Sequence, residues 1–563
     1  MTVFSQVLQQ AYLQKPDQIA IYLQHAGKPD LPISYRQLLD GANGYAQTYA
    51  ARGINPGEVI VLILQHGEDL IYSYYGAILH GAIPSIMPFL TEKLSAERYR
   101  ADLASLVEIT KPAAIVTYPE FQAEVQAALR AEDSVRAVII TSDRASSAPP
   151  DFASLPGLQR QPEDIVLLQH SSGTTGLQKG IALSHRAVFN QLDVYSQTIR
   201  LNPDDIIVSW LPLYHDMGLI AGFLMPILRG IPLVLMSPFD WVRAPYRLLQ
   251  AVSHYHGTLS WLPNFSYNFC AQKIRERDLE GVDLSSWRAV INCSEPVRWD
   301  SHQAMIERFA PYGLRKEALM TCYAMAENVF AVTQGGVDAP LVSIIVDREA
   351  LQTELLARPA IEGKPALHML STGRAISNTR IRIVDPSGKT LADHQVGEVA
   401  IQSDCMLTGF FHRTDLTTQA FIDGWYLTGD FGFLADGELY ITGRKKDLII
   451  VGGKNIYPQD LERLAMEVPG VHPGRVVAFG IYNEEQGTEE VIMVVESDNP
   501  DPQEAERLAG EIRQVVTRGS AVALRQVLIV PPMWIIKTSS GKTARTANRK
   551  KFISRQDKSQ TVE

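Results

Sequence analysis

The sequence predicts an α/β fold, with a large N-terminal domain of parallel sheets flanked by helices and a small α+β domain at the C-terminus. The chain has 563 residues, which is too many for one compact hydrophobic core, so at least two domains are expected. Through most of the chain, short β-rich runs alternate with helical segments, and this alternation indicates parallel sheets covered by helices. Near Gly443 the pattern changes, so we divide the chain into residues 1–443 and residues 444–563.

Individual segments illustrate each element type. In the large domain, residues 69–81 predict a helix, and the Pro- and Ser-rich residues 146–157 predict a surface connection. The β-rich runs there include residues 58–64, 113–118 and 137–142. In the C-terminal domain, strands are predicted at residues 475–483 and 490–497, a helix at 502–517, and a basic end.

The composition excludes several classes of function. The formal net charge of −10 argues against a general nucleic-acid binder. Residues 1–18 lack the basic start and apolar run of a signal peptide, so we predict a cytoplasmic protein. The most apolar stretch, residues 219–238, is interrupted by Arg229, Gly230 and two prolines, which favours a buried helix–turn–strand over a membrane span. The cysteines lack CxxC spacing and are predicted to be reduced core residues; they are Cys270, Cys293, Cys322 and Cys405.

The stretch HSSGTTGLQKGIALSH, residues 170–185, is unusually rich in Gly, Ser and Thr. We place it between a predicted strand at residues 163–170 and a predicted helix at residues 185–199. A loop in this position exposes N–H groups and hydroxyls that can surround a phosphate. It fits neither GxxxxGK[ST] nor GxGxxG. A flexible linker has a similar composition, but the ordered pattern and the position favour phosphate binding.

Several motifs resemble those of one superfamily. SSGTTGLQKG (171–180) resembles the phosphate loop of adenylate-forming enzymes, which include acyl-CoA synthetases, luciferases and nonribosomal adenylation domains. Further motifs follow in that superfamily's order: YAMAE (323–327), YLTGD (426–430), GRKKDLIIVGGKNIYP (443–458) and KTSSGKTART (537–546). Within the superfamily, WLPLYHDMGLI (210–220) is similar to the signature of fatty acyl-AMP ligases. Residues 337–370 are similar in position to the insertion that sets these ligases apart from CoA ligases.

This resemblance implies a fold and a reaction. It implies that the large domain includes a β-barrel-like subdomain and that the C-terminal domain is mobile. Fatty acyl-AMP ligases use ATP and Mg²⁺ to convert a fatty acid into an acyl adenylate, releasing pyrophosphate. They then transfer the acyl group to the phosphopantetheine arm of an acyl carrier protein, not to free CoA. We expect that carrier, of polyketide or nonribosomal type, to be a separate chain, and we expect a monomer with no membrane span and no nucleic-acid partner.

The resemblance also implies an ATP site. Thr174, Thr175, Gly176 and Lys179 would hold the β- and γ-phosphates. Tyr323 would stack on adenine, Asp430 would accept hydrogen bonds from the ribose hydroxyls, and Arg444 would bind ribose or phosphate. A core aromatic, a turn aspartate and a surface ion pair remain the respective alternatives. The remaining ATP-binding residues implied are Ser171, Ser172, Gly173, Ser294, Glu295, Pro296, Ala324 and Met325.

Three residues are candidates for catalysis. Glu327 would supply an oxygen ligand to Mg²⁺, which prefers carboxylate, water and phosphate oxygens. Lys542, on the turn SSGK, would stabilise charge developing at the carboxylate and α-phosphate. His215 would lie near the substrate carboxylate, with a structural role as the alternative. Lys446 aligns with the superfamily's hinge position. Lys542 could instead belong to a solvated basic tail that also contains Lys537, Arg545, Arg549, Lys550, Lys551, Arg555 and Lys558.

Four residues depart from the family's pattern. Cys293 and Ser294 replace the usual Gly and Ala in NCSEPV (292–297), Asn328 is unusual after the glutamate, and Ile536 stands where proline is common. We expect the acyl pocket to be lined from residues 222–228 and 260–269, although ordinary core packing explains most of them equally well.

Two other functions stay open. A CoA ligase of the same superfamily would share every motif, and residues 337–370 discriminate against it. A non-catalytic homologue that binds nucleotide or acyl adenylate would not be expected to keep Lys179, Glu327, Asp430, Arg444 and Lys542 together.

Overall fold

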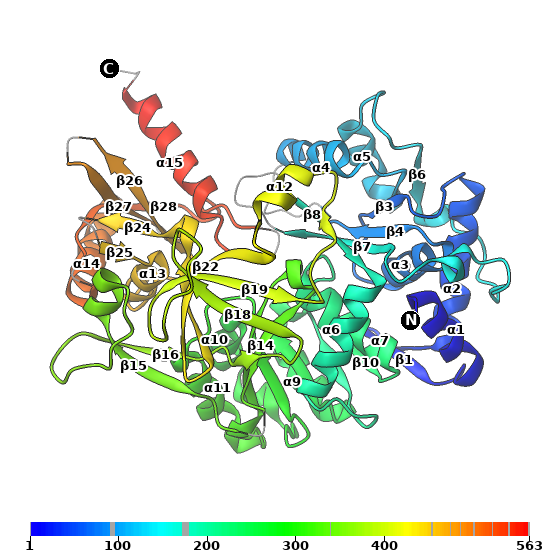
Figure 1. Cartoon of the computed structure of the whole chain (residues 1–563), viewed down its shortest axis with the longest axis horizontal. Helices are drawn as coiled ribbons and strands as arrows, with labels where there is room; N and C mark the ends of the chain where they lie inside the picture. Colours follow the sequence, from blue (N-terminus) through cyan, green and yellow to red (C-terminus); the bar gives the residue numbers. More distant parts are fainter. Residues whose placement is uncertain are drawn as a thin grey trace.

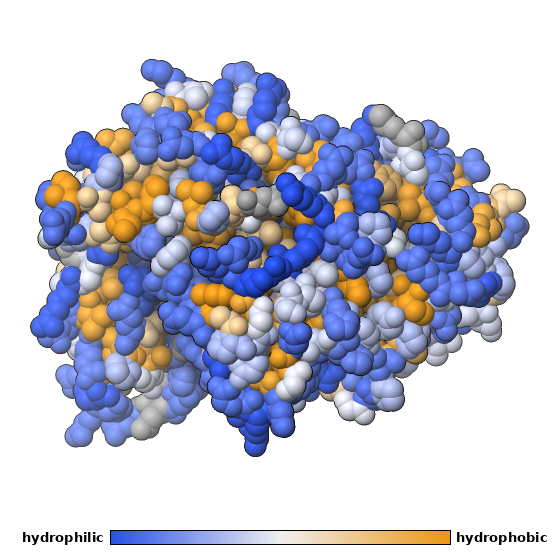
Figure 2. Space-filling view, turned by 90° about the horizontal axis from the view of Figure 1, so that it is seen from below, coloured by the Kyte–Doolittle hydropathy of each residue, from blue (hydrophilic) through white to orange (hydrophobic). Residues whose placement is uncertain are grey.

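The computed structural model describes residues 2–89, 96–171, 179–337, 339–451, 454–472, 474–484, 486–498, 501–520, 522–538 and 541–560. The N-terminal elements gather at one end of the molecule and the C-terminal elements at the other (Figure 1). Hydrophilic residues cover most of the face seen in Figure 2, with hydrophobic patches between them. The predicted α/β class, with a smaller α+β domain, is confirmed.

The larger of the two main sheets has nine strands, which come from residues 19–375. Its order is β17-β14-β13-β12-β11-β9-β10-β1-β2, and the strands from β13 to β1 run parallel. Their carboxyl ends therefore meet at one edge. The bounds are β1 Ile19–Gln24, β2 Leu31–Ser34, β9 Ile207–Ser209, β10 Leu233–Met236, β11 Leu259–Leu262, β12 Ala289–Asn292, β13 Leu319–Ala324, β14 Ala331–Gly335 and β17 Arg374–Ala375.

A seven-stranded sheet has the order β20-β8-β7-β4-β3-β5-β6. Side chains of β3 alternate between two cores: Ile60 and Leu62 face the largest one, and Val59 and Val61 face a second core under α4 and α5. The bounds are β3 Val59–Leu62, β4 Ile83–Ile86, β5 Ala114–Thr117, β6 Ala137–Ile140, β7 Ile165–Ser171, β8 Lys179–Ser184 and β20 Gly409–Phe410. All the strands predicted in this region are present.

We predicted that the Gly/Ser/Thr loop joins a strand to a helix, and this prediction is wrong. The loop joins β7 to β8, which pair antiparallel with Ser171 opposite Lys179. Residues 180–184, of which 181–183 are apolar, lie in this strand before helix α6 begins at His185. Ser184 caps the helix by accepting from the Ala187 N–H at 3.1 Å. The predicted phosphate-binding residues 172–176 lie outside the described residues.

Helices cover both sheets. α3 (Glu68–His80) matches the predicted helix and ends at Gly81, whose φ of 77° suits a residue without Cβ. The other helices of this part are α1 Phe4–Gln14, α2 Tyr35–Ala51, α4 Ala96–Thr110, α5 Gln122–Ala128, α6 His185–Thr198, α7 Met225–Arg229, α8 Pro238–Arg243, α9 Tyr246–Tyr255, α10 Asn264–Lys273, α11 Trp299–Phe309 and α12 Thr414–Gln419.

The apolar stretch at residues 219–238 is a buried helix–turn–strand, as predicted. A π-helix (η4, Met217–Leu224) continues into α7, turns at Gly230 and enters β10. Among the helices of the described residues, none is both long and apolar enough to cross a membrane.

An antiparallel sheet stands where the resemblance implied a β-barrel-like subdomain. Its strands are β18 Thr379–Val384, β19 Gly397–Ser403, β21 Phe421–Ile422, β22 Trp425–Ala435 and β23 Glu438–Arg444. The implied insertion, residues 337–370, contains a separate two-stranded sheet of β15 (Ser343–Asp347) and β16 (Ala366–Leu370).

The C-terminal part has a hydrophobic core of its own, which starts at Ile449. The predicted strands and helix are present there as β26, β27 and α14, and α15 projects from this end (Figure 1). The boundary between residues 443 and 444 stays a prediction. The bounds are β24 Ile449–Val451, β25 Lys454–Ile456, α13 Pro458–Met466, β26 Val476–Asn483, β27 Thr488–Glu496, α14 Pro502–Ser520, β28 Leu524–Val530 and α15 Arg545–Gln560.

Candidate active site

The candidate catalytic residues of the large domain gather at the carboxyl edge of the nine-stranded sheet. His215 follows β9, Glu295 follows β12, Tyr323 lies near the end of β13, and Glu327 comes four residues after Tyr323. Carboxyl ends of parallel strands are where α/β proteins bind their ligands. The topology therefore brings together residues that are far apart in sequence.

Tyr323, Asp430 and Arg444 form a connected group. The Tyr323 hydroxyl donates to Asp430 Oδ2 at 2.6 Å, and Arg444 Nε lies 3.5 Å from Asp430 Oδ1. The register of β22 and β23 places Asp430 opposite Arg444. Burial raises the pKa of the Tyr323 phenol, and the Asp430 carboxylate raises it further. The charge of Asp430 likewise raises the pKa of Arg444, so this site holds a paired carboxylate and guanidinium.

Glu327 lies beside this group. Burial raises the pKa of its carboxyl, and the negative charges of Asp216 and Asp430 add to the shift. Burial raises the pKa of the neighbouring Tyr426 phenol, and the negative charge of Glu327 raises it further. Among the described residues, no cluster of three His, Cys, Asp or Glu side chains could hold a metal alone. One carboxylate still fits Mg²⁺, because this ion takes its other ligands from phosphates and water.

Lys542 reaches this site from the C-terminal domain. Its turn is closed by two backbone bonds, from Thr538 N–H to Lys542 C=O at 2.7 Å and from Gly541 N–H to Thr538 C=O at 2.8 Å. Burial lowers the pKa of the Lys542 ammonium group, and the charge of Arg444 lowers it further, whereas Asp216 and Glu295 act in the opposite direction. The interactions with Asp216 and Glu295 bring Lys542 to side chains of the large domain.

Asp216 is a site residue that the sequence did not single out for chemistry. It braces the local backbone by accepting from the Met217 N–H at 2.8 Å, and it lies 3.4 Å from His215 Nδ1. Burial alone would raise its pKa, but the hydrogen bond and charge of His215 and the charge of Lys542 bring it below its usual value. Asp216 thus carries a negative charge toward the lysine. Its position directly after His215 was the signal available in the sequence.

Glu295 closes the site on another side. It accepts from the Phe265 N–H at 2.9 Å, and burial raises the pKa of its carboxyl while Lys542 lowers it. Phe265 meets the rings of Trp210 and Trp241, which stack at 3.6 Å. An aromatic wall therefore adjoins the charged site, in part from the predicted acyl segment at residues 260–269. Residues 222–228 are buried, and their part in an acyl pocket stays a prediction.

The replacements at Cys293 and Ser294 have a structural account. Cys293 is fully buried and contacts Cys322, and burial raises the pKa of the Cys322 thiol, with the Cys293 hydrogen bond adding to the effect. Ser294 has a φ of 70° and its Oγ lies 3.7 Å from Met217 Sδ. The larger side chain at 293 is thus packed into the core. All four cysteines are buried and free, as predicted.

Asn328 and Ile536 both take part in backbone hydrogen bonds. Buried Asn328 donates its amide to Ala331 C=O at 2.8 Å and so braces the turn at Val329, where φ is 63°. The Ile536 N–H donates to Asn548 Oδ1 at 2.8 Å, and Asn548 Nδ2 donates back to Ile536 C=O at 2.8 Å. Proline at 536 could not make the first bond.

The basic tail is not uniformly solvated, which corrects our alternative for this segment. Arg545 is buried and pairs with Asp447 at 2.9 Å and with Glu462 at 2.7 Å. Lys551 donates to Trp534 C=O at 2.6 Å and lies over the Trp534 ring. Arg545 is thus held inward by the carboxylates of Asp447 and Glu462, and Lys551 by the carbonyl and ring of Trp534.

The remaining predicted residues are placed as follows. Ser171 and Lys179 end β7 and begin β8, with side chains outside the described part. Ala324 ends β13, and the Met325 N–H donates to Phe330 C=O at 2.9 Å. Pro296 follows Glu295 in the turn after β12. Lys446 lies in a short 3₁₀ helix, Lys445–Asp447, directly after β23.

Residues 8–411 match the family described as AMP-binding enzyme. The chain belongs to this family of AMP-binding enzymes. The medium-chain-fatty-acid–acyl-carrier-protein ligase JamA of Moorena producens is 30% identical over 551 residues, 94% of this chain and 92% of that protein. The long-chain-fatty-acid–AMP ligase FadD26 of Mycobacterium bovis is 28% identical, over 96% of this chain and 95% of that protein.

Solved structures support the same assignment. A structure from a study of fatty acyl-adenylate ligases from E. coli and L. pneumophila has a TM-score of 0.89 and 28% identity, and covers 99% of this chain and 98% of its own. The predicted resemblance of this AMP-binding enzyme to fatty acyl-AMP ligases is confirmed.

Proposed function

We propose that this enzyme activates a fatty acid with ATP to form an acyl adenylate and pyrophosphate, and then transfers the acyl group to the phosphopantetheine arm of a separate acyl carrier protein. The observation that carries the proposal is the electrostatic influence of Arg444, Asp216 and Glu295 on Lys542, which lies more than 95 positions further along the sequence than any of them. Two cations and several carboxylates from both parts of the chain meet at one sheet edge, within a family of AMP-binding enzymes.

The reaction brings a carboxylate to the α-phosphorus of ATP, so the protein must hold two anions together. In this proposal, Lys542 holds the reacting carboxylate and the α-phosphate and stabilises the charge that develops there. Asp430 accepts from the ribose hydroxyls, Arg444 pairs with Asp430 and holds it in place, and His215 orients the incoming carboxylate. Glu327 holds Mg²⁺, which when bound neutralises phosphate charge.

The fatty acid substrate is supported by two features. The relatives JamA and FadD26 carry names that specify fatty acids. The aromatic wall of Trp210, Trp241 and Phe265 adjoins the charged site through the Phe265–Glu295 hydrogen bond. An apolar wall next to a site for a carboxylate suits an acid with a hydrocarbon chain.

A carrier protein as acceptor is supported by residues 337–370. This segment binds the C-terminal domain directly: Arg348 Nη1 donates to Gly519 C=O, and Asn455 Nδ2 donates to Gln352 C=O at 3.3 Å. A segment held between both domains can restrict the path of a free thiol such as CoA. The separate chain for the carrier, the monomeric state and the cytoplasmic location stay predictions.

The test is incubation with ATP, Mg²⁺, mixed medium- and long-chain fatty acids and excess CoA, with products identified by mass spectrometry. We expect acyl-AMP without acyl-CoA, and acyl-carrier product when a holo carrier protein is added. Acyl-CoA as the main product would favour the CoA ligase. Absence of pyrophosphate release with every acid would favour the non-catalytic homologue.

A second experiment tests the role of the inserted segment. Replacing residues 342–370 by a short Gly/Ser linker should let CoA act as acceptor while acyl-AMP formation continues. Exchanging Arg348 for methionine is the milder companion variant, because it removes the contact to Gly519 and keeps the segment. If both variants still reject CoA, the segment is not what excludes it.

A further inference from the structure

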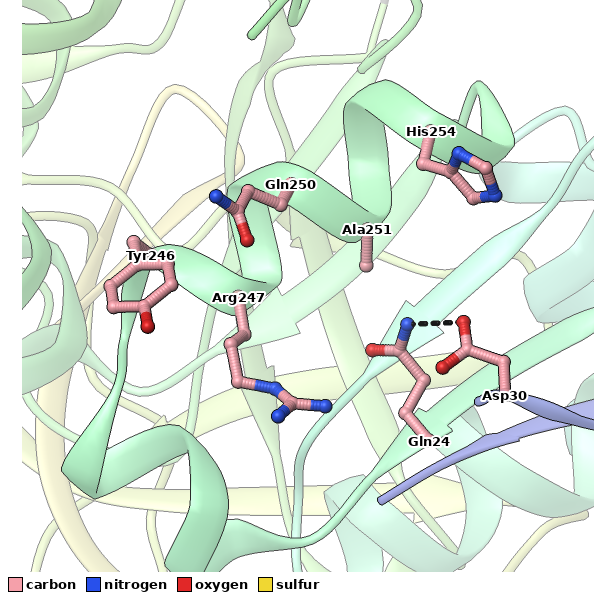
Figure 3. Close-up of a pocket in the computed structure, with 7 residues that line it drawn as sticks. All are labelled: Gln24, Asp30, Tyr246, Arg247, Gln250, Ala251 and His254. Atoms are coloured by element: carbon pink, nitrogen blue, oxygen red, sulfur yellow. Dashed lines mark hydrogen bonds between the residues drawn. The ribbon is translucent and has the colours of Figure 1, made fainter. Parts of the chain in front are cut away.

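A hollow of about 290 Å³ lies between α9 and the carboxyl end of β1 (Figure 3). Its lining residues are Gln24, Asp30, Tyr246, Arg247, Gln250, Ala251 and His254. None of them belongs to the candidate active site. β1 lies two strands beyond β9 in the sheet order, so the hollow shares the ligand-binding edge of the sheet but occupies a separate place along it.

The amide of Gln24 has a fixed orientation. Its Nε2 donates to Asp30 Oδ2 at 2.8 Å, and because an ionised carboxylate only accepts hydrogen bonds, the amide cannot be turned around. Its Oε1 is then left facing away from Asp30, without a hydrogen-bond partner, on a side chain that is only 8% exposed. Native proteins seldom leave a buried acceptor unpaired. A ligand here would meet that need with an N–H or O–H donor.

Asp30 adds a second acceptor. It also accepts from the Tyr255 hydroxyl at 2.6 Å, and this bond too ends on Oδ2. In the described part of the chain, neither bond of Asp30 comes from a cation. The carboxylate therefore keeps its negative charge available to a positively charged group in the hollow.

Arg247 supplies the opposite charge. Its guanidinium donates to His25 C=O at 3.3 Å, and no described carboxylate lies within ion-pair distance of it. Figure 3 shows it extending from α9 into the space beside Gln24. A guanidinium has five donors in a planar fork that matches a carboxylate. One backbone carbonyl leaves most of those donors for a ligand.

We propose that this hollow binds a small amino acid as a zwitterion. Its carboxylate pairs with Arg247, and its ammonium group donates to Gln24 Oε1 and to Asp30. A simple anion would leave Gln24 Oε1 unpaired, and a metal cation would be repelled by Arg247. The volume suits a single free amino acid with a side chain directed past Tyr246 or His254.

The test uses the full-length protein without ATP or fatty acid, so it is independent of the proposed reaction. Each common L-amino acid is screened at about 10 mM by saturation-transfer NMR, a concentration that occupies sites of millimolar Kd. Acetate and methylamine, each carrying one of the two charges, are the matched probes. We expect binding of at least one amino acid and at least about tenfold weaker binding of either probe.

Two variants locate the site. Arg247→Gln and Gln24→Met should each weaken binding about tenfold or more, whereas Arg243→Gln, at the exposed end of α8, should leave it unchanged. Circular dichroism checks that each variant folds. The proposal is overturned if no amino acid binds, if acetate binds as well as the amino acids, or if both folded site variants bind normally.

Discussion

The ammonium group of Lys542 lies near one cation and two carboxylates, and this setting decides what its removal does. Lys542→Ala should fold normally, because the turn is held by backbone bonds at Thr538 and Gly541. Acyl-AMP formation should fall by about a hundredfold or more, as expected for a lost preorganised donor contributing roughly 3 kcal/mol. Pyrophosphate release measures this, with the exposed Lys550→Ala on α15 as control. Near-normal adenylation by Lys542→Ala would show that Lys542 is only one more charge of the basic tail and has no catalytic role.

Glu327 gives a pH dependence with a definite sign. Burial raises the pKa of its carboxyl, so the charged form that binds Mg²⁺ appears at higher pH than for an ordinary glutamate of pKa about 4.3. The Mg²⁺ concentration for half-maximal adenylation should therefore fall as pH rises through the raised pKa. Titrating Mg²⁺ from about pH 5 to 8 measures this.

The same raised pKa has a linked effect on stability. The native state holds its proton more tightly than the unfolded chain, so this group makes the free energy of unfolding fall as pH rises between the two pKa values. Glu327→Gln should remove this slope and weaken the Mg²⁺ dependence at every pH. A variant that keeps the wild-type Mg²⁺ profile would show that another residue holds the ion.

At the scale of elements, the short segment before Lys542 depends on one amide. Asn548 is fully buried on α15 and bonds both the N–H and the C=O of Ile536. Ile536→Pro removes the first bond and leaves a buried acceptor unpaired, so the free energy of unfolding of the C-terminal part should fall by about 1–3 kcal/mol. Urea unfolding measures this. Ile536→Val keeps the bond and should cost less; equal effects of both changes would assign the loss to packing alone.

These elements also mark what the sequence could predict. The periodicity of apolar residues and the local composition predicted five elements correctly, because the apolar residues of each are regularly spaced and buried. These elements are α3, β3, β5, β26 and β27. Periodicity and composition missed β8, where an apolar run of only three residues, 181–183, stands between the Gly-rich loop and α6. They also assigned Arg545 to a solvated tail, since its partners Asp447 and Glu462 become neighbours only in the folded domain. Asp216 was underrated for the same reason: its charge matters through Lys542, 326 positions away in the numbering of the chain.

At the scale of the molecule, the two parts of the chain are tied at several points around the site. Arg298, which precedes α11, pairs with Asp460 of α13 at 3.1 Å, and Arg348 bonds Gly519. Together with Lys542 beside Arg444, these contacts describe an arrangement suited to adenylation. Transfer to a carrier requires the phosphopantetheine thiol to reach the same carbonyl, so the lysine turn must leave after the first step. The contacts at Asp460 and Gly519 are only partly buried, and such a rotation would have to break them.

The connection between the parts provides the test of that rotation. Lys446 lies in the short 3₁₀ helix between β23 and β24, and proline fixes φ near −65°, a value that such a helix already uses. Lys446→Pro should keep the observed arrangement and prevent backbone rotation at this residue. Acyl-AMP formation should stay within about threefold of wild type, while acyl transfer from preformed acyl-AMP to a holo carrier protein should fall about a hundredfold. Single-turnover assays of each step measure both rates, with Lys446→Ala as the control that keeps rotation free. If proline slows both steps equally, position 446 is not the hinge, and a rotation would have to use other residues of the 444–448 connection.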